Sequence, residues 1–207
     1  MADLPAPLPR RYYLSWVDGE HNHDIGVKLA KSLAALNQQR LTVILANKNH
    51  LQPIFKGVDI VTTRSGGPLE NRFMAAIYPN ARTMSRFYGD DMRFMIVDWA
   101  RNPMRGWAAV HGAYDLRTGQ YLEDDRPQEV REIHERIAHS GYNGFTSPPG
   151  SYTIKKDLTE LHKQGWLDER GKDYLVASLF EEQSDSSLAD LRKLADKINA
   201  RPPHTWQ

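Results

Sequence analysis

The fold is decided by residues 11–46, which read RYYLSWVDGEHNHDIGVKLAKSLAALNQQRLTVILA. Residues 11–17 contain two tyrosines, a tryptophan and a valine and end at a turn signal, so they predict a strand. A helix capped by Asn22 or Asp24 is expected next, because apolar residues then recur at helical spacing. These apolar residues are Ile25, Leu29, Leu33 and Leu36. Residues 41–46 form a continuous apolar run, typical of a strand buried on both faces, and the whole stretch predicts a βαβ unit.

The alternation of strands and helices continues to about residue 125. We expect a short helix or turn at 49–56, strands at 58–63 and 92–98, a helix at 69–78, and a hairpin with arms 107–114 and 120–122 around a turn at 116–119. The predicted fold class is therefore α/β, with a Rossmann-like, mainly parallel sheet and flanking helices at 11–125. The Pro-rich residues 1–10 are expected to be a flexible leader.

The pattern becomes helical after residue 125, and we expect a helical or winged-helix-like region at 126–200 and a tail at 201–207. Helices are predicted at 127–140, 151–164 and 188–200, whereas 174–180 suits either a strand or a helix. The stretch 151–167, with the following DERGK and YLV, resembles the recognition helix and wing of winged-helix proteins. This resemblance implies phosphate contacts from Lys155, Lys156 and Lys163. A plain helical appendage is the alternative.

The composition excludes several classes of protein. The 207-residue chain contains no cysteine, which excludes disulfides, cysteine zinc sites and thiol catalysis. No apolar run is long enough to span a membrane and no signal-peptide pattern opens the chain, so we expect a cytoplasmic protein without a membrane partner. The formal net charge of +1 favours no class of partner by itself.

Acidic and imidazole side chains gather directly after the first predicted strand. The candidate catalytic residues are Asp18, Glu20, His21 and His23. Ligands of parallel sheets bind at the carboxyl ends of strands, and mixed oxygen and imidazole donors suit a divalent metal as cofactor. In the alternative interpretation, Asp and Asn side chains cap the next helix and the histidines lie in water.

A second candidate site follows the strand expected at 58–63. Its hydroxyl, arginine and glycine residues suit a phosphate cradle and are Thr63, Arg64, Ser65, Gly66 and Gly67. The preceding DIVTT at 59–63 resembles the phosphate loop of phosphoribosyltransferases, although Val58 stands where that loop has a second acidic residue. An ordinary Gly-Gly-Pro turn is the alternative.

Arginine and aromatic residues alternate between residues 64 and 107. The arginines Arg86, Arg93, Arg101 and Arg105 are candidate nucleic-acid contacts, together with the aromatic residues Phe73, Tyr78, Phe87, Tyr88, Phe94, Trp99 and Trp107. Arginine neutralises phosphates and aromatic rings stack on bases, which is the chemistry of a nucleic-acid surface. Alternatively, the rings belong to the core and the arginines form a solvated face.

A further carboxylate, Asp98, ends the strand expected at 92–98 and precedes a hairpin and a helix with Glu129, Glu132 and Glu135. This order resembles the start of ribonuclease H-like nucleases, which implies carboxylates converging on a metal pair. Solvated glutamates on the helix are the alternative.

Three functions are consistent with these patterns. The first is nucleic-acid binding through the Arg–aromatic stretch and the Lys-bearing helix. The second is an enzyme acting on a nucleotide or other phosphorylated small molecule at the strand ends. The third is a non-catalytic assembly subunit that forms a homo-oligomer, for which the five tryptophans and nine tyrosines provide interface residues.

Overall fold

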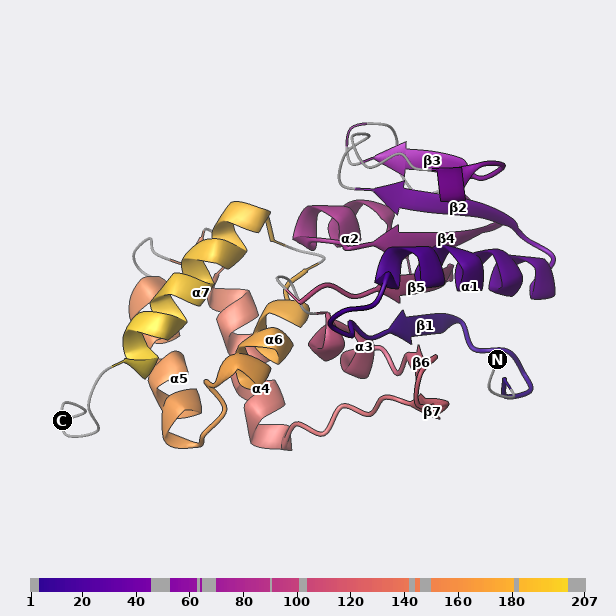
Figure 1. Cartoon of the computed structure of the whole chain (residues 1–207). Helices are drawn as coiled ribbons and strands as arrows, with labels where there is room; N and C mark the ends of the chain where they lie inside the picture. Colours follow the sequence, from indigo (N-terminus) through magenta and orange to yellow (C-terminus); the bar gives the residue numbers. More distant parts are fainter. Residues whose placement is uncertain are drawn as a thin grey trace. The chain divides into compact units, whose positions relative to one another are not determined.

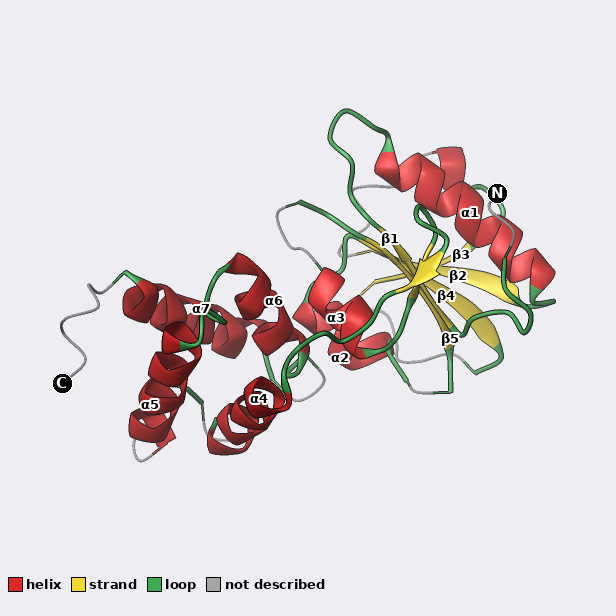
Figure 2. Ribbon diagram, turned by 90° about the horizontal axis from the view of Figure 1, so that it is seen from below, coloured by secondary structure: helices red, strands yellow, loops and turns green. Residues whose placement is uncertain are grey.

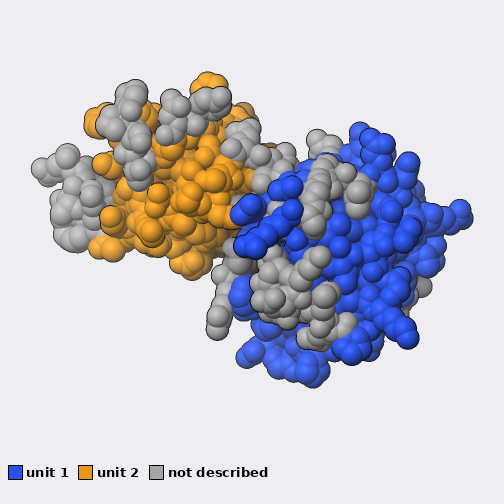
Figure 3. All heavy atoms as spheres, turned by 90° about the horizontal axis from the view of Figure 1, so that it is seen from above, with its two compact units in different colours: residues 1–124 blue, residues 125–207 orange. Residues whose placement is uncertain are grey.

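The computed structural model describes residues 4–45, 53–62, 64, 70–89, 91–100, 104–141, 144–145, 150–180 and 183–200. The chain divides into two compact units, residues 1–124 and 125–207, which are coloured separately in Figure 3. In the part of the chain that the structure describes, no helix is long and apolar enough to cross a membrane.

The first unit is built on a sheet of seven strands among the described residues (Figure 1). They are β1 (Arg11–Leu14), β2 (Arg40–Leu45), β3 (Asp59–Thr62), β4 (Arg72–Ile77), β5 (Arg93–Val97), β6 (Tyr114–Asp115) and β7 (Gln120–Tyr121). Their order in the sheet is β3-β2-β4-β5-β1-β6-β7, and every neighbouring pair is parallel except β6 and β7. The predicted α/β class with a mainly parallel sheet is confirmed.

Helices cover both faces of this sheet. They are α1 (Asn22–Leu36), α2 (Ala81–Phe87) and α3 (Arg105–Val110), with a short 3-10 turn, η2 (Pro53–Phe55). The chain crosses from β1 to β2 in one direction along the sheet, and from β4 to β5 and from β5 to β6 in the other. Because such crossovers are right-handed, α1 lies on one face and α2 and α3 lie on the opposite face (Figure 2).

The core on the α1 face contains Val27 and Leu33 of α1 together with Leu14, Val43 and Val97 of the sheet. On the other face, Trp107 of α3 is fully buried and its ring contacts that of Phe94, with ring centroids 6.1 Å apart. The apolar run expected at 41–46 is β2, whose residues Leu41–Leu45 are all buried, as predicted for a strand covered on both sides.

Two predictions for the first unit are wrong. Residues 72–77 form strand β4 and not part of a helix at 69–78, because this Met- and Ala-rich segment is enclosed between β2 and β5 and buried nearly throughout. The helix begins after Asn80, whose Oδ1 accepts a hydrogen bond from the Thr83 amide at 2.9 Å. Residues 105–110 form α3 and not a strand arm, although the hairpin turn at 116–119 is confirmed by the pairing of β6 with β7.

The described residues of the second unit form four helices and no strand. These are α4 (Gln128–Ser140), α5 (Gly150–Lys163), α6 (Glu169–Ala177) and α7 (Asp185–Asn199). Apolar side chains such as Ile137, Leu158, Leu175 and Leu191 are buried within it. The segment expected to be the wing lies largely in α6, so the region is helical and a winged helix is not confirmed.

Candidate functional site

The strand order reverses beside β1. The connection from β1 runs past β5 and β4 to β2, whereas the connection from the neighbouring strand β5 runs past β1 to β6. The loops that leave the carboxyl ends of β1 and β5 therefore diverge toward opposite faces. In open α/β sheets this switch point is where ligands bind. The side chains that follow these two strands are therefore the first candidates for a ligand site.

The loop between β1 and α1 is held by Asn22, which is 1% exposed. Its Nδ2 donates to the carbonyl oxygens of Val17 at 2.6 Å and Glu20 at 3.1 Å, and its Oδ1 accepts from the Val17 amide at 3.1 Å. A buried side-chain amide with all these groups paired fixes the backbone of a loop that has no regular structure of its own. The predicted helix cap at Asn22 or Asp24 is wrong, because His21 stands at the N-cap position of α1, and Asn22 instead organises the loop before the helix.

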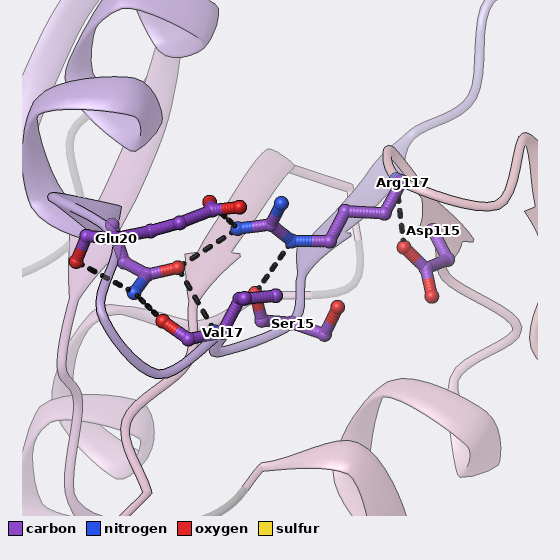
Figure 4. A network of polar contacts seen from close by, with 6 residues as sticks. Ser15, Val17, Glu20, Asp115 and Arg117 are labelled. Carbon is purple, nitrogen blue, oxygen red and sulfur yellow. Dashed lines mark hydrogen bonds and ion pairs between the residues drawn. The ribbon is translucent and has the colours of Figure 1, made fainter.

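Arg117, which follows β6, joins this loop from a distant part of the chain (Figure 4). Its Nε donates to the carbonyl of Ser15, and its terminal nitrogen Nη2 donates to Glu20 Oε2 and Asn22 Oδ1, all at 2.8 Å. Its own amide donates to Asp115 Oδ1 at 2.9 Å. Arg117 thus ties the ends of β1 and β6 together, a role that no local sequence pattern indicated.

The four predicted catalytic residues are not gathered into one constellation. Glu20 is engaged by Arg117, and His23 Nε2 lies 3.0 Å from Asp24 Oδ1. Asp18 and His21 are exposed, and His21 occupies the N-cap position of α1 without a side-chain capping hydrogen bond. Among the described residues, no group of three or more His, Asp or Glu side chains is arranged to hold a metal ion.

Asp98 forms a buried pair with Tyr13 at the end of β5. The Tyr13 hydroxyl donates to Asp98 Oδ2 at 2.5 Å, and the Met104 amide donates to Oδ1 at 2.8 Å. Burial raises the pKa of the Asp98 carboxyl, with the hydrogen bonds acting in the opposite direction. Burial and the neighbouring Asp98 raise the pKa of Tyr13 as well. The helix glutamates expected with Asp98, namely Glu129, Glu132 and Glu135, are exposed on α4.

The wild-type protein is expected to lose stability as the pH rises and the Asp98 carboxyl ionises. Asp98→Asn should not show this loss. A raised pKa in the folded state means that the protonated carboxyl stabilises the fold below its ordinary pKa of 3.8 and that this contribution is lost as the pH rises through the folded-state pKa. The unfolding free energy of Asp98→Asn minus that of the wild type should therefore increase above pH 3.8. Urea unfolding at a series of pH values measures it. A difference that stays flat with pH for Asp98→Asn would contradict the raised pKa of this carboxyl.

Three aromatic residues follow three adjacent strands at the same edge. Trp16 lies two residues after β1, Tyr78 directly after β4 and Trp99 two residues after β5. The ring centroids of Trp16 and Tyr78 are 5.8 Å apart, and those of Tyr78 and Trp99 are also 5.8 Å apart with the rings stacked. All three side chains are half-buried. We call Trp16, Tyr78 and Trp99 the edge aromatic cluster. From the sequence, Trp16 was assigned only to a strand, whereas Tyr78 and Trp99 were predicted as aromatic contacts for nucleic acid.

The predicted phosphate cradle lies mostly outside the described residues, namely Thr63, Ser65, Gly66 and Gly67. Arg64 is described and exposed, and its amide donates to Thr62 Oγ1 at 3.4 Å at the end of β3.

The predicted Arg–aromatic surface is corrected in part. The rings of Phe73, Phe87, Phe94 and Trp107 are fully buried, so they belong to the core and cannot stack on bases. Arg93 donates to the carbonyls of Leu8 and Pro9, Arg86 and Arg105 are exposed, and Arg101 lies outside the described residues. Lys155, Lys156 and Lys163 are exposed on α5, and contacts of these residues with nucleic acid stay a prediction.

Comparisons of the chain with models of protein families, with curated proteins and with solved structures find no match. The function of the protein is therefore inferred from the geometry of the site.

Proposed function

We propose that the first unit binds a nucleotide or another phosphorylated small molecule at the carboxyl ends of β1 and β5, as a Rossmann-like sheet does. The observation that carries this proposal is the reversal of strand order between these two strands. Because of this reversal, the loops after β1 and β5 run toward opposite faces of the sheet, and ligands bind between such loops in other open α/β sheets. The loop after β1 also leads directly into α1, a fifteen-residue helix whose amino end favours a negative charge.

The side chains around this edge supply the chemistry that the proposal needs. The loop that holds them is fixed in advance by Asn22 and Arg117, so little conformational entropy is lost when a ligand binds. Asp18 and His21 are exposed in the segment that leads into α1 and are the groups available for acid–base chemistry on a bound substrate. Glu20 is assigned a structural role in this proposal, because Arg117 engages its carboxylate.

Binding of nucleic acid is a second candidate, supported by one face of α5. Tyr152, Lys155, Lys156 and Lys163 are exposed and recur at helical spacing along this helix. Lysines in such a row neutralise successive phosphates, and an exposed tyrosine can stack on a base. This candidate involves residues of the second unit only, so one mapping experiment distinguishes it from the first.

Hydrogen exchange measured by mass spectrometry tests both candidates on the full chain. Nucleoside monophosphates and sugar phosphates are expected to slow exchange in peptides that cover residues 15–23 and 98–100, with inorganic sulfate as the control for bulk anion effects. A single-stranded oligonucleotide at low salt is expected to slow exchange at 152–163 if the second candidate holds, and Lys155→Ala with Lys156→Ala should remove that effect. The absence of protection at 15–23 and 98–100 with every small molecule would refute the first proposal.

A further inference from the structure

The edge aromatic cluster spans the ends of three neighbouring strands. In the sheet, β4, β5 and β1 are adjacent, and each contributes one ring to the cluster through a residue that follows it. Core rings of the same unit, such as Phe94 and Trp107, are fully buried, whereas the three rings of the cluster keep part of their surface in solvent. The cluster therefore presents a partly exposed aromatic surface to solvent at the switch point between β1 and β5.

The backbone of Tyr78 departs from the strand geometry in a way that completes this cluster. Leu14, Ile77 and Val97 all belong to the core on the α1 face. Alternation along a strand places residues two positions further, Trp16 and Trp99, toward the same face, but it places Tyr78 toward the opposite face. The backbone of Tyr78 is instead left-handed, with φ of 53°, and its ring packs against the α1-face core.

A left-handed conformation costs free energy in an aromatic residue, and such residues are concentrated at ligand sites. Two contacts hold this conformation, one at the backbone amide of Tyr78 and one at its side-chain hydroxyl. Its amide donates to the carbonyl of Val97 at 3.0 Å, and its hydroxyl interacts with the backbone of His23 at the start of α1. The ring is thus fixed in position between Trp16 and Trp99 before any ligand arrives.

We infer that the ligand of this site carries a planar aromatic ring, as a nucleobase does, and that the edge aromatic cluster binds this ring by stacking. The inference rests on the proposed function and narrows it from phosphorylated small molecules in general to nucleosides and nucleotides. Stacking suits the cluster because aromatic side chains bind the face of any base without a need for specific hydrogen bonds. A sugar phosphate without a base would leave the cluster unused.

Isothermal titration of the full chain with AMP, GMP, CMP and UMP, and with ribose 5-phosphate, tests the inference. Ribose 5-phosphate carries the same sugar and phosphate without the base. We expect at least one mononucleotide to bind more tightly than ribose 5-phosphate. Trp99→Ala should weaken binding of that nucleotide by about 5- to 150-fold, the loss typical of one stacked base. Trp99→Phe, which keeps an aromatic ring, should retain most of the affinity.

Tyr121→Ala is the matched control, because it removes an aromatic ring that is 51% exposed on β7, outside the edge aromatic cluster, and should leave the affinity unchanged. Equal affinity of the wild type for the mononucleotides and ribose 5-phosphate would overturn the inference while leaving the proposed function intact. The inference would also be overturned if Trp99→Phe and Trp99→Ala both bound the nucleotide as tightly as the wild type. If none of the five compounds binds, the proposed function itself fails. The comparison between the mononucleotides and ribose 5-phosphate uses the wild-type protein, so it decides the question even if Trp99→Ala does not fold.

Discussion

Replacing Asn22 with alanine is expected to lower the free energy of unfolding by about 2–4 kcal/mol. The substitution removes the side-chain amide that pairs with the backbone of Val17 and Glu20 and with Arg117 in a buried place. The groups left behind would be only partly reached by water, so their desolvation adds to the lost hydrogen bonds. Urea unfolding followed by circular dichroism measures the change, and the same variant should lose binding at the strand ends because the loop is no longer fixed.

Arg117→Ala, combined with Asn22→Ala in a double-mutant cycle, tests whether the two side chains act together. Because Arg117 and Asn22 belong to one network, the double variant should lose less stability than the two single variants added together, by at least about 0.5 kcal/mol. An additive result would show that the two side chains stabilise the protein independently, which contradicts a single network around the loop.

The second large effect is expected at Gly26, where α1 packs closely against Val97 of β5. A Cβ atom at this position would lie 2.4 Å from Val97 Cγ2 and 3.0 Å from Val97 Cγ1. The valine side chain is buried and rigid, so it cannot move away as the end of a flexible side chain would. Gly26→Ala is therefore expected to lower the free energy of unfolding by about 1–3 kcal/mol, although alanine normally stabilises a helix relative to glycine.

Val97→Ala tests the cause of that loss. By itself it should destabilise the protein, since it removes two buried methyl groups and leaves a cavity. Combined with Gly26→Ala, it should make room for the added methyl group, so the double variant should be more stable than the sum of the single effects predicts. A Gly26→Ala variant as stable as the wild type would mean that α1 does not pack on β5 at this distance.

The sequence predicted best those helices and strands whose spacing of apolar residues follows from which of their own side chains are buried. Residues 11–46 carry a turn, a helical apolar spacing and a β-branched apolar run, and the structure has β1, α1 and β2 there. Strand β4 was missed because RFMAAI has neither alternation nor β-branched residues before its last position. Only its place between two other strands makes it extended, and this is a property of the tertiary structure.

The sequence predicted that the residues after β1 lie at the carboxyl edge of the sheet, but it did not predict which side chains meet there. The region after β1 was expected at the carboxyl edge because of the βαβ pattern, and it lies there. The roles of Asn22 and Arg117 depend on a contact between residues 95 positions apart, which no local spacing can show. Tyr78 and Trp99 were predicted as stacking residues of a nucleic-acid surface, but their grouping with Trp16 in the edge aromatic cluster was missed for a similar reason. Trp16 and Trp99 share one signal, since each stands two residues beyond a strand of the same sheet.

The most direct test of ligand binding at the strand ends is a nuclear magnetic resonance titration of protein labelled with ¹⁵N in its tryptophan indoles, with AMP as the probe. The indole signals are assigned by single Trp→Phe substitutions. We expect the signals of Trp16 and Trp99 to shift with a common saturation curve, while the signal of Trp166 in the second unit stays in place. Stationary signals from Trp16 and Trp99 at saturating AMP, or a shift confined to Trp166, would contradict a nucleotide site at this edge of the sheet.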